Sequence, residues 1–298
     1  MKKIVECVAN FSEGRREHFV DEIVAAISGV AGVQVLGYES DADHNRSVVT
    51  FIGAPRAVAA AAFAGVKVAA AKIDMNRHRG QHPRIGAADV IPFVPLRNVT
   101  MAQCVDLARS LGARVGEALQ LPVFLYGEAA LQAENRELSA IRRGGYEGLR
   151  KSIETGVAPQ PDFGPRRLGS AGGSVIGARD ILIAFNVYLA TTDGSIAKAI
   201  ARSIRQSSGG MPGVKALGFF VKGKAQVSMN LTDYRVTSMG AAFERIRQLA
   251  AQYGVGIDSS EIIGLIPRAA LAGTSAADLQ IMNYGPERIL ETFLDEDQ

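Results

Sequence analysis

The sequence predicts an α+β protein built from two ferredoxin-like α/β-sandwich subdomains with mainly antiparallel sheets. First, 298 residues with 47% apolar side chains are enough for two hydrophobic cores. Second, the order strand, helix, strand, strand, helix, strand occurs twice. Third, a stretch rich in proline and glycine, residues 157–173, separates the two occurrences and is expected to join them. We place the subdomains at 1–178 and 179–298 and expect a ligand cleft between them.

The first subdomain begins with a strand in which β-branched residues alternate, followed by a helix with apolar residues at helical spacing. Proline opens its second helix, where a helix tolerates it. The predicted order is strand 3–11, helix 15–28, strands 33–38 and 46–52, helix 55–73 and strand 90–95. This is the split βαβ order of a ferredoxin-like unit, in which two helices cover one face of the sheet. Helix 100–119, strand 123–126 and helix 134–155 follow.

The second subdomain repeats this order without a recognisable residue-level repeat. Lys222-Gly223-Lys224 predicts the turn of a hairpin. The predicted elements are strand 181–189, helix 196–206, strands 216–221 and 225–229, helix 239–253 and strand 262–266. A helix over 286–293 is expected near the end of the chain.

Composition limits the classes of function. A net charge of +3 and the absence of tryptophan argue against a nucleic-acid partner. Apolar runs stay well below the ~18 residues that cross a bilayer, and the N-terminus carries no signal-like segment, so we expect a cytoplasmic protein without membrane association. The two cysteines lack a CxxC spacing, which fits a reducing compartment and offers no zinc set.

The segment 76–90 is the most unusual in the chain, because it holds two of the four histidines and three arginines before a buried strand. A histidine titrates near neutrality, so His82, held by Pro83, is a candidate general acid or base. The alternative is that both histidines are solvated loop residues. The remaining histidines, His18 and His44, also belong to the first subdomain, and His44 lies in a second polar loop, 41–46.

A metal site is an alternative use of the same segment, since His78 and His82 are four residues apart. Asp41, Asp43 and Asp89 are the carboxylates that would join them. Gly80 and Pro83 disfavour the helix that this spacing requires, and the glutamate of an H-E-x-x-H motif is missing. We therefore expect no metal, and Asp41 and Asp43 are also typical of a strand-end turn.

The glycine-rich loop 163–173 runs into a strand-like segment, whereas phosphate-binding glycine loops open a helix. A nucleotide site is therefore not expected. Its two arginines suit a lid that closes on a carboxylate-bearing ligand. A plain linker remains an alternative.

Several segments together resemble the formiminotransferase family: residues 5–15, 45–48, 80–93, 162–165 and 177–186. The resemblance implies two ferredoxin-like subdomains with folate between them, and a homodimer. It implies transfer of a formimidoyl group from N-formimidoyl-L-glutamate to tetrahydrofolate or its polyglutamate, a co-substrate, in histidine degradation. The products would be 5-formimidoyltetrahydrofolate and L-glutamate.

The resemblance also implies roles for residues. In the family the histidine of a Gly-x-His-Pro-Arg motif is the catalytic acid/base, and this position is His82. The family's folate-binding loop corresponds to Phe163, Gly164, Pro165, Arg166, Arg167, Leu168, Gly169, Ser170, Ala171 and Gly172. Without a family match for the role, we expect support of His82 from Asp41, Asp43 and Asn45, and carboxylate binding by Arg46 and Arg84.

Alternative functions stay open. The donor could be N-formylglutamate, which differs from the formimidoyl donor by one atom, or the chain could be a non-catalytic folate-binding module. The chain ends soon after the last predicted helix, so we expect the cyclodeaminase reaction to need a separate polypeptide.

Overall fold

The computed structural model describes residues 2–157 and 159–295. The chain divides into two units, Met1–Arg179 and Asp180–Gln298, and each has a hydrophobic core of its own. Among the described residues, no helix combines the length and the apolar character needed to cross a lipid bilayer.

Unit 1 begins with the predicted ferredoxin-like order. Its first elements are β1 (Ile4–Phe11), α1 (Glu17–Ser28), β2 (Val33–Asp41), β3 (Arg46–Gly53), α2 (Pro55–Lys72) and β4 (Ala88–Arg97). The strands lie in the order β2-β3-β1-β4, and all neighbours among them are antiparallel. The predicted α+β class with mainly antiparallel sheets is therefore confirmed.

Two further strands extend this sheet in parallel. The elements are α3 (Met101–Ala118), β5 (Val123–Gly127), η1 (Ala133–Arg136), α4 (Leu138–Ile141), α5 (Gly145–Glu154) and β6 (Ser174–Ala178). β6 lies between β4 and β5 and pairs in parallel with both. The proline- and glycine-rich segment 157–173 thus leads back into the sheet of unit 1. The prediction that it joins the two units is therefore wrong. Local composition does not show that the strand after this segment pairs with β4.

The helix predicted over 134–155 is interrupted. Gly144 and Gly145 have φ angles of 82° and 64°, in the left-handed region that ends a right-handed helix. The segment therefore forms one 3-10 turn and two short helices instead of one long helix.

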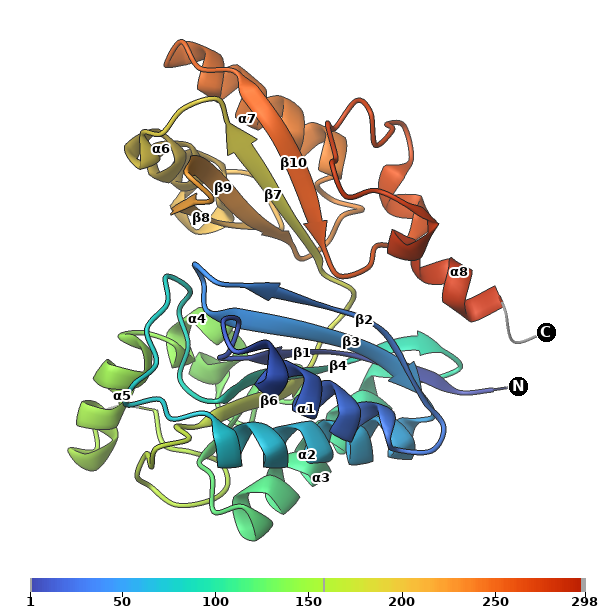
Figure 1. Ribbon diagram of the computed structural model, residues 1–298, viewed down its shortest axis with the longest axis vertical. Helices are drawn as coiled ribbons and strands as arrows, with labels where there is room; N and C mark the ends of the chain where they lie inside the picture. Colours follow the sequence, from blue (N-terminus) through green and yellow to red (C-terminus); the bar gives the residue numbers. More distant parts are fainter. Residues whose placement is uncertain (1, 158, 296–298) are drawn as a thin grey trace. The chain divides into compact units, whose positions relative to one another are not determined.

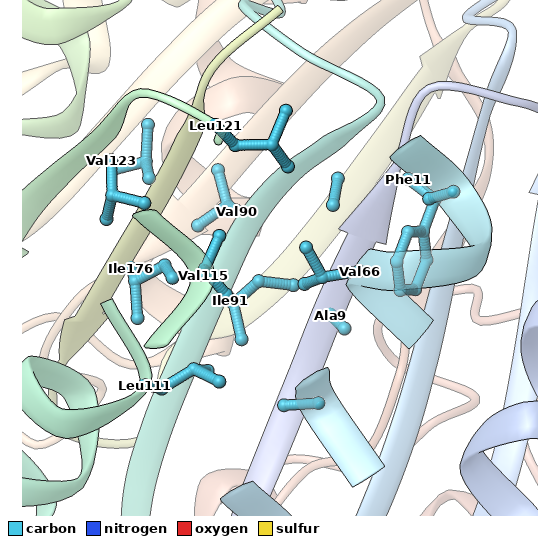
Figure 2. Packing of buried hydrophobic residues seen from close by; sticks show 14 of the residues in the cluster. Ala9, Phe11, Val66, Val90, Ile91, Leu111, Val115, Leu121, Val123 and Ile176 are labelled. Carbon is cyan, nitrogen blue, oxygen red and sulfur yellow. The ribbon is translucent and has the colours of Figure 1, made fainter. Parts of the chain in front are cut away.

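Helices α1, α2 and α3 cover one face of the six-stranded sheet (Figure 1). Successive strand residues point to opposite faces, so the buried Cys7 and Ala9 face the helices while Glu6 and Asn10 lie on the other face. Figure 2 shows part of the helix-side core, in which Val66 of α2 and Val115 of α3 lie beside Ile91 of β4.

Unit 2 repeats the ferredoxin-like order. It consists of β7 (Ile183–Leu189), α6 (Gly194–Ile204), η2 (Gln206–Ser208), β8 (Val214–Val221), β9 (Lys224–Leu231), α7 (Met239–Gln252), β10 (Ile257–Ile263), η3 (Arg268–Leu271), η4 (Pro286–Arg288) and α8 (Leu290–Asp295). The antiparallel strands lie in the order β10-β7-β9-β8. Lys222 and Gly223 both have positive φ, 52° and 73°, as a two-residue hairpin turn requires.

The last strand of unit 2 starts at Ile257, five residues before the predicted start at 262. Residues 258–261 are polar and lack the apolar pattern by which a buried strand is predicted. Ser260 and Glu261 are nevertheless buried, so the burial of this strand depends on tertiary pairing with β7.

Candidate active site

Loops remote in sequence meet at one end of the unit 1 sheet. They follow β1, connect β2 to β3, and precede β4 and β6, and these strand ends lie on the same side because of the strand directions. Backbone hydrogen bonds connect the loops: Ser12 N donates to Ala87 O at 2.9 Å, and Gln81 N donates to Asp43 O at 3.1 Å. The two polar loops that the sequence singled out, 41–46 and 76–90, are therefore neighbours.

Glycine permits this close approach at two positions. A Cβ atom on Gly80 would lie 2.1 Å from the carbonyl oxygen of His44, and one on Gly86 would lie 1.8 Å from that of Gly173. Any larger residue at either position would push the loops apart.

His82 is half-buried where these loops meet. Its Nε2 lies 2.8 Å from Nη1 of Arg46, and its ring meets the ring of His44 edge-on at 5.7 Å between centroids. A guanidinium only donates, so Nε2 accepts and the proton of the neutral ring is on Nδ1. Burial first, and then the charges of Arg46 and Arg142, hold the pKa of His82 well below its ordinary value. The imidazole is therefore uncharged at neutral pH.

Arg142 is a member of this site that the sequence did not indicate. It forms an ion pair with Asp89, whose other oxygen accepts the amide hydrogen of Ile85 at 2.7 Å. Burial, followed by repulsion from Arg142, lowers the pKa of Arg46 to about 10. Arg142 follows a short helix that lies far along the chain from His82, so no local motif could have identified it.

His78 and Arg84 form a structural clamp. His78 Nε2 donates to the carbonyl oxygen of Asn45 at 2.8 Å, and its Nδ1 accepts from Nε of Arg84 at 3.1 Å. Arg84 also binds both carboxylate oxygens of Glu147, at 2.8 and 2.7 Å. The carboxylate that Arg84 contacts is thus one of the protein's own.

The ring nitrogens of His78 are both engaged, which leaves neither for the metal suggested by its spacing to His82. Within residues 2–157 and 159–295, His, Cys, Asp and Glu side chains form no group of three or more placed to hold a metal ion.

The remaining residues of loop 41–46 shape its backbone. Asp41 Oδ1 accepts the amide hydrogen of His44 at 2.8 Å, and Asp43 is exposed. Asn45, at a φ of 48°, accepts from Gly14 N at 3.0 Å and donates to Arg79 O at 3.0 Å. These contacts join the loop to its neighbours, whereas the side chain in contact with Nε2 of His82 is Arg46.

The loop 163–172 is attached along its length to unit 1. The ring of Phe163 packs against Gly112 and Gly116 of α3. Near its other end, Ser170 O accepts from Met75 N at 2.7 Å and Ala171 O from Ala87 N at 2.8 Å. These bonds place its last residues beside the flanks of the His82 loop. Leu168 is buried, while Arg166 and Arg167 are exposed.

The comparison with known families uses nearly the whole chain. Residues 4–179 match the formiminotransferase domain, N-terminal subdomain, and residues 184–285 match the formiminotransferase domain. The chain belongs to the formiminotransferase family. The resemblance noted from the sequence is therefore confirmed, and the chain is a transferase enzyme of this family's kind.

Two relatives of this formiminotransferase agree with it in length as well as in sequence. The chain is 51% identical over 292 residues to a glutamate formimidoyltransferase of Thermoplasma acidophilum, covering 97% of this chain and 96% of the relative. It is 42% identical to one of Streptococcus pyogenes serotype M1, covering 99% of each. A formimidoyltransferase-cyclodeaminase of Dictyostelium discoideum is 43% identical over 94% of this chain but only 53% of its own length.

Proposed function

We propose that the protein is a glutamate formimidoyltransferase that moves the formimidoyl group from N-formimidoyl-L-glutamate to N5 of tetrahydrofolate. The products are 5-formimidoyltetrahydrofolate and L-glutamate, and the reaction serves histidine degradation. The observation that carries the proposal is the neutral imidazole of His82 among cationic side chains, in a loop whose flanks are hydrogen-bonded to the residues that end the loop 163–172.

His82 acts as the general acid/base. The N5 lone pair of tetrahydrofolate attacks the formimidoyl carbon, and His82 accepts the N5 proton from the tetrahedral intermediate. The same proton passes to the glutamate nitrogen as the bond between that nitrogen and the formimidoyl carbon breaks. An imidazole can accept a proton only while it is uncharged, and burial with two nearby arginines keeps His82 uncharged by lowering its pKa.

The rest of the rate enhancement comes from binding both substrates in one site. A positioned acid/base contributes typically ~10²–10⁴-fold, and the remainder comes from bringing the donor and the folate together in the correct orientation. The loop Phe163–Gly172 binds folate, with its backbone fixed against unit 1 and the exposed Arg166 and Arg167 available for the carboxylates of a polyglutamate tail.

We propose that the protein is a cytoplasmic homodimer. We also propose that a separate cyclodeaminase carries out ring closure and ammonia release. Relatives about twice as long are named formimidoyltransferase-cyclodeaminase. Light scattering of the purified protein measures the dimer directly.

Replacement of His82 by alanine tests the assignment. We expect kcat to fall ~10²–10⁴-fold while the Kd for tetrahydrofolate stays near that of the wild type. His18→Ala, in an exposed residue of α1, is the matched control and should keep full turnover. A non-catalytic folate-binding module would show no such loss.

A coupled assay of glutamate release, with N-formimidoyl-L-glutamate and N-formyl-L-glutamate side by side, identifies the donor. Faster release from the formimidoyl compound is expected. If the purified protein releases no glutamate from either donor in the presence of tetrahydrofolate, the transferase assignment is wrong.

A further inference from the structure

We propose that Arg46 and Arg142 together bind a carboxylate of the amino-acid donor next to His82, and that Arg142 is a specificity-determining residue for this donor. The inference rests on the proposed function, because it assigns the acidic amino acid to a place within the same site. It goes beyond the sequence expectation for Arg46, since the second arginine comes from a remote segment of unit 1.

Arg46 is a cation whose side-chain partners carry no negative charge. Among the described residues, the hydrogen-bond partners of the Arg46 guanidinium are Oδ1 of Asn10 at 3.4 Å and Nε2 of His82 at 2.8 Å, and both are neutral. Among the described residues, no carboxylate lies within ion-pair distance of the Arg46 guanidinium. A guanidinium removed from water is costly without an anion, so the site is electrostatically incomplete.

Arg142 has a hydrogen-bond donor that is unused among the described residues. One of its terminal nitrogens pairs with Asp89, but its Nε is buried and has no hydrogen-bond partner among the described residues. Buried donors are nearly always satisfied, so an orphaned Nε indicates an acceptor that arrives with a ligand. The hydrogen on Nε points to the same side of the guanidinium as Nη2, the nitrogen that pairs with Asp89, so Nε is the donor left for one oxygen of an incoming carboxylate.

Among the described residues, Arg142 has an ion-paired carboxylate and Arg46 has none. Arg46 and Arg142 are close enough to repel each other, and the carboxylate that pairs with Arg142 is that of Asp89, which also accepts from Ile85 N. Asp89, Asp41 and Glu39 also attract Arg46, but none of them forms an ion pair with it. A carboxylate of glutamate would supply the ion-pair partner that Arg46 lacks.

The arrangement also couples donor binding to the base. In the structure Arg46 donates to Nε2 of His82 and so occupies a lone pair that could take a proton. A carboxylate that accepts hydrogen bonds from Arg46 competes for that donor and offsets the positive charges that face the imidazole. Those charges belong to Arg46 and Arg142, with His44 as the third titratable neighbour. Binding of the donor thus makes His82 a stronger base when it is needed.

The test uses L-glutamate, the product, as the probe for calorimetric titration. We expect Arg142→Met to weaken L-glutamate binding by about tenfold or more and to raise the KM for the donor similarly, while the KM for tetrahydrofolate stays unchanged. The matched control is Arg143→Met, which removes the exposed arginine next in sequence and should leave both values as in the wild type. Equal binding of L-glutamate by Arg142→Met and wild type would overturn the proposal.

Two further measurements distinguish the loss of a ligand contact from damage to the fold. Arg142→Met leaves Asp89 buried without its partner. The double variant Asp89→Asn with Arg142→Met removes both charges, so it should fold while still failing to bind L-glutamate tightly.

In the wild type, saturating L-glutamate should raise the pKa of His82 measured by histidine NMR. No rise in that pKa would contradict the coupling.

The L-glutamate titration and the NMR measurement do not require transfer. If L-glutamate binding depends on Arg142 but no formimidoyl transfer occurs, the site stands and the proposed function fails. If transfer occurs and Arg142→Met keeps the donor KM of the wild type, the function stands and the site is wrong.

Discussion

The side chains around His82 decide its protonation state. Burial and the two nearby guanidinium groups lower its pKa, so a residue that is often half-protonated near neutrality is held neutral. Burial likewise lowers the pKa of His78, which is fixed between Asn45 and Arg84. The same environment that prepares a base therefore makes folding depend on pH.

The first prediction concerns that pH dependence. Below pH ~6.5 a histidine of the unfolded chain takes up a proton that the folded His82 does not, so the free energy of unfolding should decrease as the pH falls, by up to about 1.4 kcal/mol per pH unit for each such histidine. His82→Gln should make this slope shallower. Urea unfolding of both proteins between pH 5 and 8 measures it, and identical slopes would contradict the prediction.

The second prediction concerns Glu6, a buried carboxyl on the sheet face of unit 1 opposite the helices. Burial raises its pKa to about 7, although Arg179 acts in the opposite direction. The folded state therefore holds a proton that the unfolded chain has lost, and the stability cost grows as the pH rises from 4.5 to about 7.

Glu6→Gln should accordingly raise the free energy of unfolding at pH 8, by at most about 3 kcal/mol, and the gain should vanish below pH 4.5. Denaturant unfolding at the two pH values provides the measurement. A variant less stable than the wild type at pH 8 would show that the ionised carboxylate stabilises the fold.

At the scale of elements, the loop 163–172 depends on the backbone of the loop before β4. Gly172 has a φ of 73°, and a Cβ atom there would lie 2.2 Å from the carbonyl oxygen of Ile85. Gly169, three residues earlier in the same loop, has no atom within 4 Å of its Cβ position.

The third prediction compares these glycines. Gly172→Ala should destabilise the protein by roughly 1–3 kcal/mol and weaken tetrahydrofolate binding, because the added methyl group separates the two loops. Gly169→Ala should match the wild type in stability. Thermal unfolding and a folate titration of the two variants give the comparison, and equal behaviour would remove the close approach as the cause.

The start of α3 provides the fourth prediction. Thr100 Oγ1 accepts from Gln103 N at 3.3 Å, while Gln103 Oε1 accepts from Thr100 N at 3.1 Å, which is a complete capping box. Thr100→Ala should cost about 1 kcal/mol in denaturant unfolding, whereas Thr100→Ser keeps the hydroxyl and should cost less. An equal loss in both variants would point to the methyl group of Thr100 instead.

At the scale of the whole molecule, each unit buries its own apolar residues against its own sheet. We propose that the two units are independently folding domains. The fifth prediction is that residues 180–298, expressed alone, unfold cooperatively on heating when followed by circular dichroism. The isolated segment should have no transferase activity, because His82 and the loop Phe163–Gly172 belong to unit 1. A non-cooperative transition would show that unit 2 depends on unit 1.

The sequence alone determined most of the elements, because the signals are local. Alternating side chains specified β1, Pro55 marked the start of α2, and Lys222-Gly223 specified the hairpin turn. It also singled out His82, since polar residues are unusually dense in its loop. Tertiary structure decided what depends on distant pairing: β6 entered the sheet between β4 and β5, and Arg142 came close to Arg46. These contacts join segments far apart in the chain, and packing, which no local pattern records, is what brings them together.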